Sequence, residues 1–170
     1  MSSSFPGYRV GSLTYTSRSL MIVMFWMLLG DLCLQIKEQL PTSLVPLQLR
    51  WASASDTLIG FISGSLPAVL GILLNPIIGV QSDRHRGKHG RRRPFLLMAT
   101  PLVVLALLGL GFTKPMSALL TTLTGATSAN LVEIGWIGGC MVVFVVANTY
   151  IMQVYQFLFV DVIPAEVMGR

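Results

Sequence analysis

The amino-acid sequence predicts an all-α membrane protein with four transmembrane helices. Only 11% of its 170 residues are charged and 53% are hydrophobic, whereas a soluble domain carries about 25% charged residues. Apolar stretches recur along the chain, each about long enough to cross a hydrocarbon core of about 30 Å. The one dense polar run, a basic loop over residues 80–94, separates two of these stretches. Membrane insertion is therefore the first class that the composition favours.

Residues 1–18 form a polar tail that we expect to be cytoplasmic and loosely ordered. The first span is predicted over residues 20–44. Its first apolar run is too short to cross alone, so the helix must continue through Asp31. Pro41 and Pro46 are expected to kink or close it. No small-residue cleavage site follows the run, which indicates an uncleaved span rather than a signal peptide.

The second span is predicted over residues 57–79, after an external loop over residues 48–56. Ser55 or Asp56 can cap its first turn, because a side-chain oxygen there satisfies free backbone amides. Small residues at helical spacing in this span favour close helix packing.

The third span is predicted over residues 95–113 and the fourth over residues 131–160. Residues 116–130 between them are richer in Ser and Thr, and are read as an external loop or a surface helix. The fourth span is longer than a bilayer requires, which indicates a tilted or protruding helix. Together, residues 19–170 form one four-span domain.

The distribution of Lys and Arg predicts the orientation. Positive residues resist translocation, so the side richer in them stays cytoplasmic. Nine lie on the side of the basic loop and two on the other. The first set is Arg9, Arg18, Arg84, Arg86, Lys88, Arg91, Arg92, Arg93 and Arg170, and the second is Arg50 and Lys114. Both ends of this chain are therefore expected in the cytoplasm, in the plasma or inner membrane.

Asp31 is the first candidate functional residue. It is expected about 16 Å into the first span, near the bilayer centre, where a carboxylate is costly and marks a function by default. Gln35 and Glu38 continue a polar stripe on that helix. A structural pairing of Asp31 with Lys37 or another helix is the alternative. Lys37 and Glu38 lie nearer the predicted outer end and are as well explained as interfacial.

The fourth span carries a second group of polar side chains, which includes Asn148, Tyr155 and Gln156. Asn148 and Tyr155 are seven residues apart, and so share one helix face. Such side chains either bond between helices or line a cavity.

Gly79-x-x-x-Asp83-Arg84, followed by Gly90-Arg91-Arg92-Arg93, resembles the signature loop of the major facilitator superfamily. The end of the chain, with Asp161-x-x-Pro164, is similar to the loop after the fourth helix in the sugar–cation symporter branches, of the sucrose and glycoside-pentoside-hexuronide type. The resemblance spans nearly the whole chain. It covers about the first third of the usual twelve-helix protein, which implies an incomplete N-terminal half of that fold.

The resemblance implies a secondary active carrier of a sugar or glycoside, coupled to a proton or sodium and working by alternating access. The solute and cation pathway would use Asp31, Gln35, Asn148, Tyr155 and Gln156. The resemblance also implies a conformational latch on the cytoplasmic side. Its residues would be Gly79, Asp83, Arg84, Gly90, Arg91, Arg92 and Asp161. Further C-terminal helices or a second chain would be needed for transport.

The alternative is a truncated four-span protein that does not transport and acts as an assembly or regulatory subunit, with its basic loop on anionic lipid or a partner. We expect no enzyme, since no Ser–His pair, zinc spacing or paired acids stand in catalytic positions. No cofactor, metal site or nucleic-acid partner is expected. Cys33 and Cys140 lie in apolar runs and form no disulfide framework.

Overall fold

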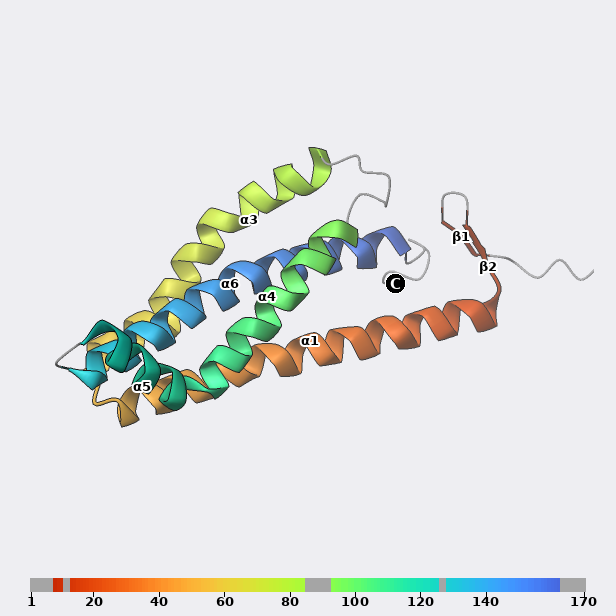
Figure 1. Ribbon diagram of the computed structural model, residues 1–170. Helices are drawn as coiled ribbons and strands as arrows, with labels where there is room; N and C mark the ends of the chain where they lie inside the picture. The colour runs from red at the N-terminus through yellow and green to blue at the C-terminus, as the bar shows by residue number, and fades with distance from the viewer. Residues whose placement is uncertain (1–7, 11–12, 85–92, 126–127, 163–170) are drawn as a thin grey trace, which may run out of the picture.

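A computed structural model describes residues 8–10, 13–84, 93–125 and 128–162 (Figure 1). Apart from one short hairpin, the described residues form helices joined by brief connections, which confirms the predicted all-α class. The elements are β1 (Tyr8–Val10), β2 (Leu13–Tyr15), α1 (Ser17–Trp51), α2 (Asp56–Gly60), η1 (Phe61–Ser65), α3 (Leu66–Arg84), α4 (Arg93–Gly111), α5 (Thr113–Thr124) and α6 (Ala129–Val162).

The hairpin lies in the tail that was expected to be loosely ordered. β1 and β2 pair antiparallel, with Tyr8 opposite Tyr15 and Val10 opposite Leu13. Aromatic and β-branched residues favour extended backbone, which accounts for strands in so short a segment. The helical part of the chain begins immediately after it, with Thr16 as the N-cap of α1.

Helix α1 continues well past the predicted end of the first span. It runs through Pro41 and Pro46 to Trp51, so the predicted loop over residues 48–56 shrinks to residues 52–55. A proline removes one backbone donor, but helices in membranes tolerate this where neighbouring groups compensate. Pro41 is fully buried in the bundle. Packing therefore holds the helix together where local sequence signals predicted its end.

The second apolar segment is one continuous helical stretch, from α2 through η1 into α3. The Ser55 hydroxyl accepts a bond from the Leu58 amide at 3.4 Å, so of the two predicted caps, Ser55 and Asp56, the structure uses Ser55. η1 is a wider, π-helical turn that lies two residues before Pro67. Such turns accommodate an interruption in the regular helical bonding without ending the helix.

Helix α4 ends in a sharp break, and α5 continues at 82° to it. The structure thus forms a helix where the sequence allowed a loop or a surface helix. The freed carbonyl of Leu110 accepts bonds from Thr113 Oγ1 at 2.7 Å and from Gln48 Nε2 at 2.8 Å. Trp136 Nε1 donates to the Gly109 carbonyl at 2.9 Å. Side chains from α1, α5 and α6 therefore satisfy groups that a helix end leaves open.

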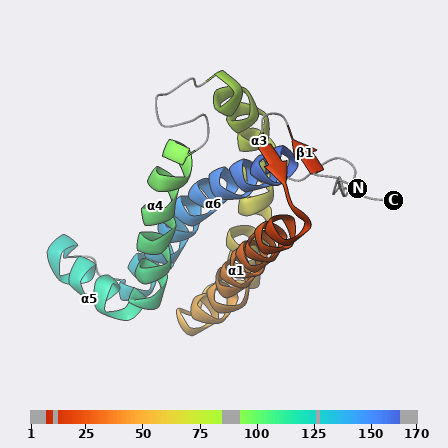
Figure 2. The ribbon, with the colours of Figure 1, turned by 90° about the vertical axis from the view of Figure 1, so that its right-hand side faces the viewer.

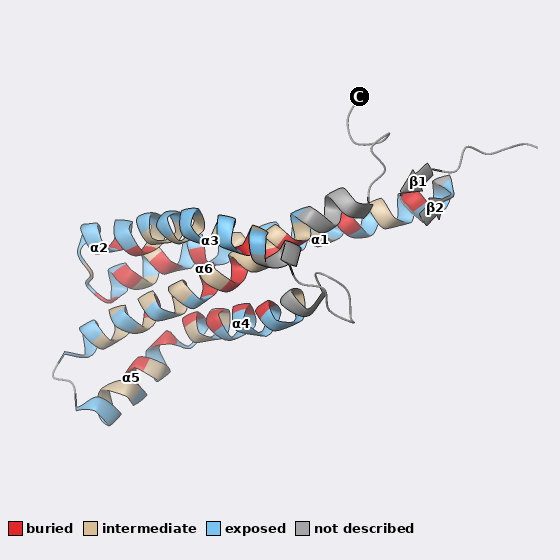
Figure 3. Ribbon diagram, turned by 90° about the horizontal axis from the view of Figure 1, so that it is seen from above, coloured by how far each residue is buried: buried red, intermediate tan, exposed pale blue. Residues whose placement is uncertain are grey.

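Helix α6 is the central element of the bundle. It contacts α1, α3, α4 and α5, and the red, buried positions in Figure 3 follow its length. Its buried side chains are Ile137, Met141, Phe144, Val145, Ala147, Asn148, Ile151 and Val154. Figures 1 and 2 show successive long helices running in alternating directions. The end of α3 and the start of α4 therefore lie toward the same end of the bundle as the start of α1.

The outer surface of the bundle is apolar. Ile72 is 74% exposed and Leu97 is 75% exposed, and many other large hydrophobic side chains point outward. Among the described residues, three segments are long and apolar enough to cross a membrane: Arg18–Trp51, Asp56–Val80 and Ala129–Gln156. The bent α4–α5 pair would make a fourth. An apolar exterior of this extent suits a lipid environment.

Candidate functional site

Polar side chains join α1 to α6 near the middle of both helices. The Lys37 ammonium donates a hydrogen bond to Oδ1 of Asn148. Lys37 is half-buried, and Asn148 is only 9% exposed. Each residue lies about three positions from the midpoint of its helix, which is about 4.5 Å along the axis. The contact therefore places the Lys37 ammonium near the middle of two apolar helices.

A second polar contact joins the same two helices two turns away. The Tyr155 hydroxyl donates to the Met27 carbonyl on α1. Gly30 makes this approach possible, because a Cβ there would lie 2.9 Å from the Tyr155 oxygen. Asp31 directly follows Gly30, so it lies beside the point where Tyr155 meets α1. Asp31, like Lys37, is three residues from the midpoint of α1.

The structure brings some of the predicted pathway residues together and separates others. Asn148 and Tyr155 both contact α1, so each makes a bond between helices. Asp31 lies beside Tyr155, but its side chain is exposed on the bundle surface. Gln35 and Gln156 are also exposed. The predicted residues therefore lie along one helix pair, partly in its contact and partly at its edge.

Lys37 is a candidate site residue that sequence reasoning did not select. Its interfacial reading followed from a span ending near residue 44, whereas α1 extends to Trp51 and moves Lys37 toward mid-helix. One signal was present in the sequence. Lys37 lies seven residues after Gly30, and so on the face through which α1 meets α6.

The predicted latch lies largely outside what the structure describes. Gly79 is in α3, and the backbones of Asp83, Arg84 and Asp161 are helical. Gly90, Arg91 and Arg92 lie outside the described residues. The latch stays a prediction.

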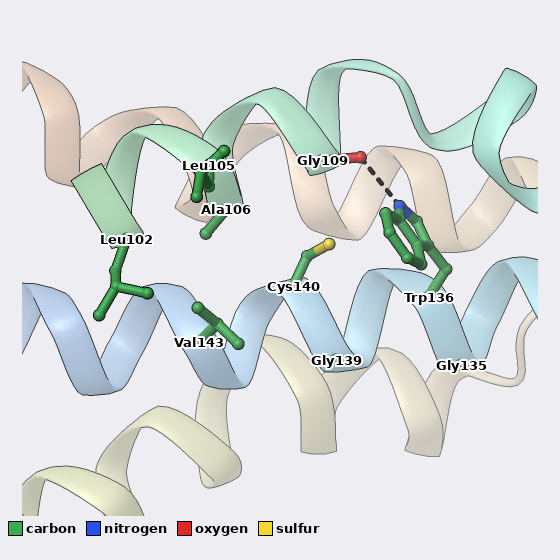
Figure 4. A pocket seen from close by; sticks show the side chains of 9 residues that line it. All are labelled: Leu102, Leu105, Ala106, Gly109, Gly135, Trp136, Gly139, Cys140 and Val143. Atoms are coloured by element: carbon green, nitrogen blue, oxygen red, sulfur yellow. Dashed lines mark hydrogen bonds between the residues drawn. The ribbon is translucent and has the colours of Figure 1, made fainter.

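A groove of about 410 Å³ lies between α4 and α6. Figure 4 shows its lining, which consists of Leu102, Leu105, Ala106, Gly109, Gly135, Trp136, Gly139, Cys140 and Val143. The Trp136 indole is bonded to the Gly109 carbonyl. The helices are close here, since a Cβ at Gly109 would lie 2.7 Å from the Cys140 sulfur. This lining offers few polar groups to a ligand, whereas the α1–α6 contact offers several, so the α1–α6 contact is the stronger candidate site.

Within the described ranges, no group of three His, Cys, Asp or Glu side chains could hold a metal ion. The arrangement at α1 and α6 instead offers hydrogen-bond donors, a carboxylate and a phenol.

The family described as MFS/sugar transport protein matches residues 51–160. The mouse protein named proton-associated sugar transporter A is 38% identical over 93 residues, which are 51% of this chain and 12% of the relative. Its human counterpart is 44% identical over 66 residues, which are 39% of this chain and 8% of the relative. A sucrose transport protein of Arabidopsis thaliana is 35% identical over 52 residues, or 31% of this chain and 9% of the relative.

The matched segments thus span only about a tenth of these relatives' own length. No solved structure matches the chain.

Proposed function

The chain belongs to the MFS/sugar transport protein family, and from that premise we propose that it forms part of a proton- or cation-coupled carrier of a sugar or glycoside. The membership supports a role in sugar transport and an integral membrane protein. The coupling ion, the solute and the transport cycle belong to the proposal. The names of the mammalian relatives, proton-associated sugar transporter A, favour a proton as the coupling ion.

The observation that carries the proposal is the polar contact between α1 and α6. Lys37 and Asn148 are bonded near the middle of two apolar helices, where a charged side chain costs at least about 2.5–3.5 kcal/mol on insertion scales. Carriers of this superfamily bind solute and coupling ion near the bilayer midplane. A donor-rich contact at that depth is therefore the natural place for a hydroxylated solute.

Asp31 is the proposed coupling acid. It lies at the same distance from the midpoint of α1 as Lys37, on the opposite side of that midpoint. It directly follows Gly30 and lies one turn after Met27, whose carbonyl accepts the Tyr155 bond from α6. Gaining or losing a proton there would change the charge at the α1–α6 contact and bias one arrangement of the two helices over another.

The complete solute path requires further helices or a second chain, which move against this bundle in alternating access. The latch residues, from Gly79 to Asp161, would hold the cytoplasmic side closed in one state. We place the carrier in the plasma or inner membrane with both ends of this chain in the cytoplasm.

Uptake by the complete carrier tests the proposal. The carrier, with every partner that it requires, is reconstituted into liposomes under an imposed pH or sodium gradient, and uptake of radiolabelled sucrose and D-glucose is measured. We expect gradient-driven accumulation of at least one sugar. The Asp31→Asn variant should lose uphill accumulation while keeping normal expression, because the amide cannot carry the proton.

Asp56→Asn is the matched control, since Asp56 is an exposed acid in the first turn of α2, at the end of the bundle. It should retain uphill uptake. Normal gradient-driven uptake by the Asp31→Asn variant would remove Asp31 from the coupling step. Failure of the unaltered carrier to accumulate either sugar under both gradients would overturn the proposed function.

A further inference from the structure

The contact between Lys37 and Asn148 joins a side chain that only donates hydrogen bonds to one that both donates and accepts. The lysine ammonium carries three N–H donors and uses one on Oδ1 of Asn148. This bond orients the Asn148 amide, because its oxygen must face Lys37 and its NH₂ group must face away. The orientation is therefore imposed by α1 on a residue of α6.

The remaining donors of the pair have no partner among the described residues. Two ammonium N–H groups and the two amide N–H groups of Asn148 form no further bond within that part of the chain. Asn148 is nine-tenths buried. Buried donors normally find an acceptor, because leaving them unpaired costs free energy.

We propose that Lys37 and Asn148 together form a subsite that binds one hydroxyl oxygen of the transported sugar. Lys37 acts as a positioning residue for the Asn148 amide and as a donor in its own right. The inference rests on the proposed transport function and adds a specific residue pair and a specific solute atom to it.

The surrounding charges favour a neutral hydroxyl over a carboxylate. Asp31 and Glu38 lie on the same stretch of α1 as Lys37, and Glu38 attracts the Lys37 ammonium. Both carboxylates lie within six residues of Lys37 on α1, so an anionic solute would add a third negative charge to this region. A sugar hydroxyl accepts the N–H bonds without that repulsion.

Deoxy sugars test the subsite directly. Competition by D-glucose and by its 2-, 3-, 4- and 6-deoxy analogues is measured against uptake of radiolabelled sucrose or D-glucose in liposomes. One analogue should compete about tenfold less well than the parent sugar, because it lacks the oxygen that the pair binds. The Asn148→Asp variant keeps an acceptor for Lys37 but removes the amide donors. It should raise KM about tenfold and no longer distinguish that analogue.

Variants of Lys37 distinguish two roles: positioning the Asn148 amide for the solute, and holding α1 and α6 together. Lys37→Arg keeps the donors and should retain discrimination among the analogues. Lys37→Met removes the donors and should lose that discrimination. If the contact only held helices together, these variants would lower the maximal rate equally for every sugar and leave relative affinities unchanged.

Gln153→Ala is the matched control. Gln153 is on α6 and bonds to Asn75 of α3 at 3.1 Å, so its removal also breaks a polar bond between helices. It should leave the analogue pattern intact. A wild-type carrier that transports sugar while Asn148→Asp and Lys37→Met keep its KM and analogue pattern would overturn the subsite alone. An inactive wild-type carrier would overturn the transport function and the subsite with it.

Discussion

At Gly30 the absence of a side chain lets the Tyr155 hydroxyl reach the backbone of α1. The nearest Tyr155 ring carbon would lie 3.4 Å from a Cβ at this position, and the hydroxyl oxygen 2.9 Å from it. The hydroxyl is bonded to the Met27 carbonyl, and so has little freedom to retreat. The absence of a Cβ at Gly30 therefore allows the close approach of α1 and α6 at this point.

Replacing Gly30 with alanine should destabilise the bundle by about 1–3 kcal/mol, because the new methyl group overpacks the Tyr155 contact. Thermal unfolding of the purified protein in detergent, followed by helical circular dichroism, measures this cost. Gly64→Ala is the control, since a Cβ there meets nothing within 4 Å.

The pair Gly30→Ala and Tyr155→Phe sharpens that prediction. Removing the hydroxyl relieves the closest approach, so the double variant should lose less stability than the sum of the single variants. Strictly additive losses would show that the Tyr155 hydroxyl is not what the alanine methyl meets.

Among the elements, the break between α4 and α5 depends on side chains from other helices. Leu110 lies in the last turn of α4, and its carbonyl accepts hydrogen bonds from both Thr113 and Gln48. Thr113 is only 3% exposed, so water does not readily replace these bonds. The bend is therefore held by tertiary contacts as well as by the local sequence.

Thr113→Val should lower stability by about 0.6–1.7 kcal/mol, the range for single polar bonds between helices in membranes. The variant keeps the side-chain shape but removes the hydroxyl that bonds the Leu110 carbonyl. Thermal unfolding in detergent provides the measurement. Thr122→Val is the matched control in the same helix, since exposed Thr122 bonds only the Leu119 carbonyl one turn back. Equal losses in both variants would contradict a special role for the α4 end.

Element boundaries show where local signals mislead. Pro41 and Pro46 predict the end of the first span, yet α1 continues to Trp51. Ser55 and Asp56 predict the start of the next helix, and Ser55 caps that start in the structure. A capping side chain bonds a backbone amide in the adjacent turn, so the local sequence is enough to predict it. A buried proline is compensated by packing from another helix, which no local pattern reports.

For the whole molecule, the alternating helix directions separate two ends. The start of α1 lies at one end, and the end of α5 lies toward the other (Figure 1). The excess of Lys and Arg on the side of the basic loop predicts that the start of α1 lies in the cytoplasm.

Cysteine labelling in sealed cells tests this orientation. In a background with Cys33→Ala and Cys140→Ala, Thr124→Cys should react with a membrane-impermeant maleimide added outside. Arg18→Cys should react only after the cells are permeabilised. Both native positions, Thr124 and Arg18, are exposed. The reverse pattern would invert the orientation and move the basic loop to the outer face.

The sequence by itself determined the helical class, the membrane environment, the family resemblance and a helix cap at Ser55 or Asp56. It also singled out Asp31, Asn148 and Tyr155. Only the tertiary structure decided that Lys37 meets Asn148, that Tyr155 meets the α1 backbone at Gly30, and that α1 passes both prolines. The physical reason is the lipid solvent. In water, apolar periodicity marks the face that packs, whereas membrane helices are apolar all round, and only their contacts reveal which face meets a neighbour.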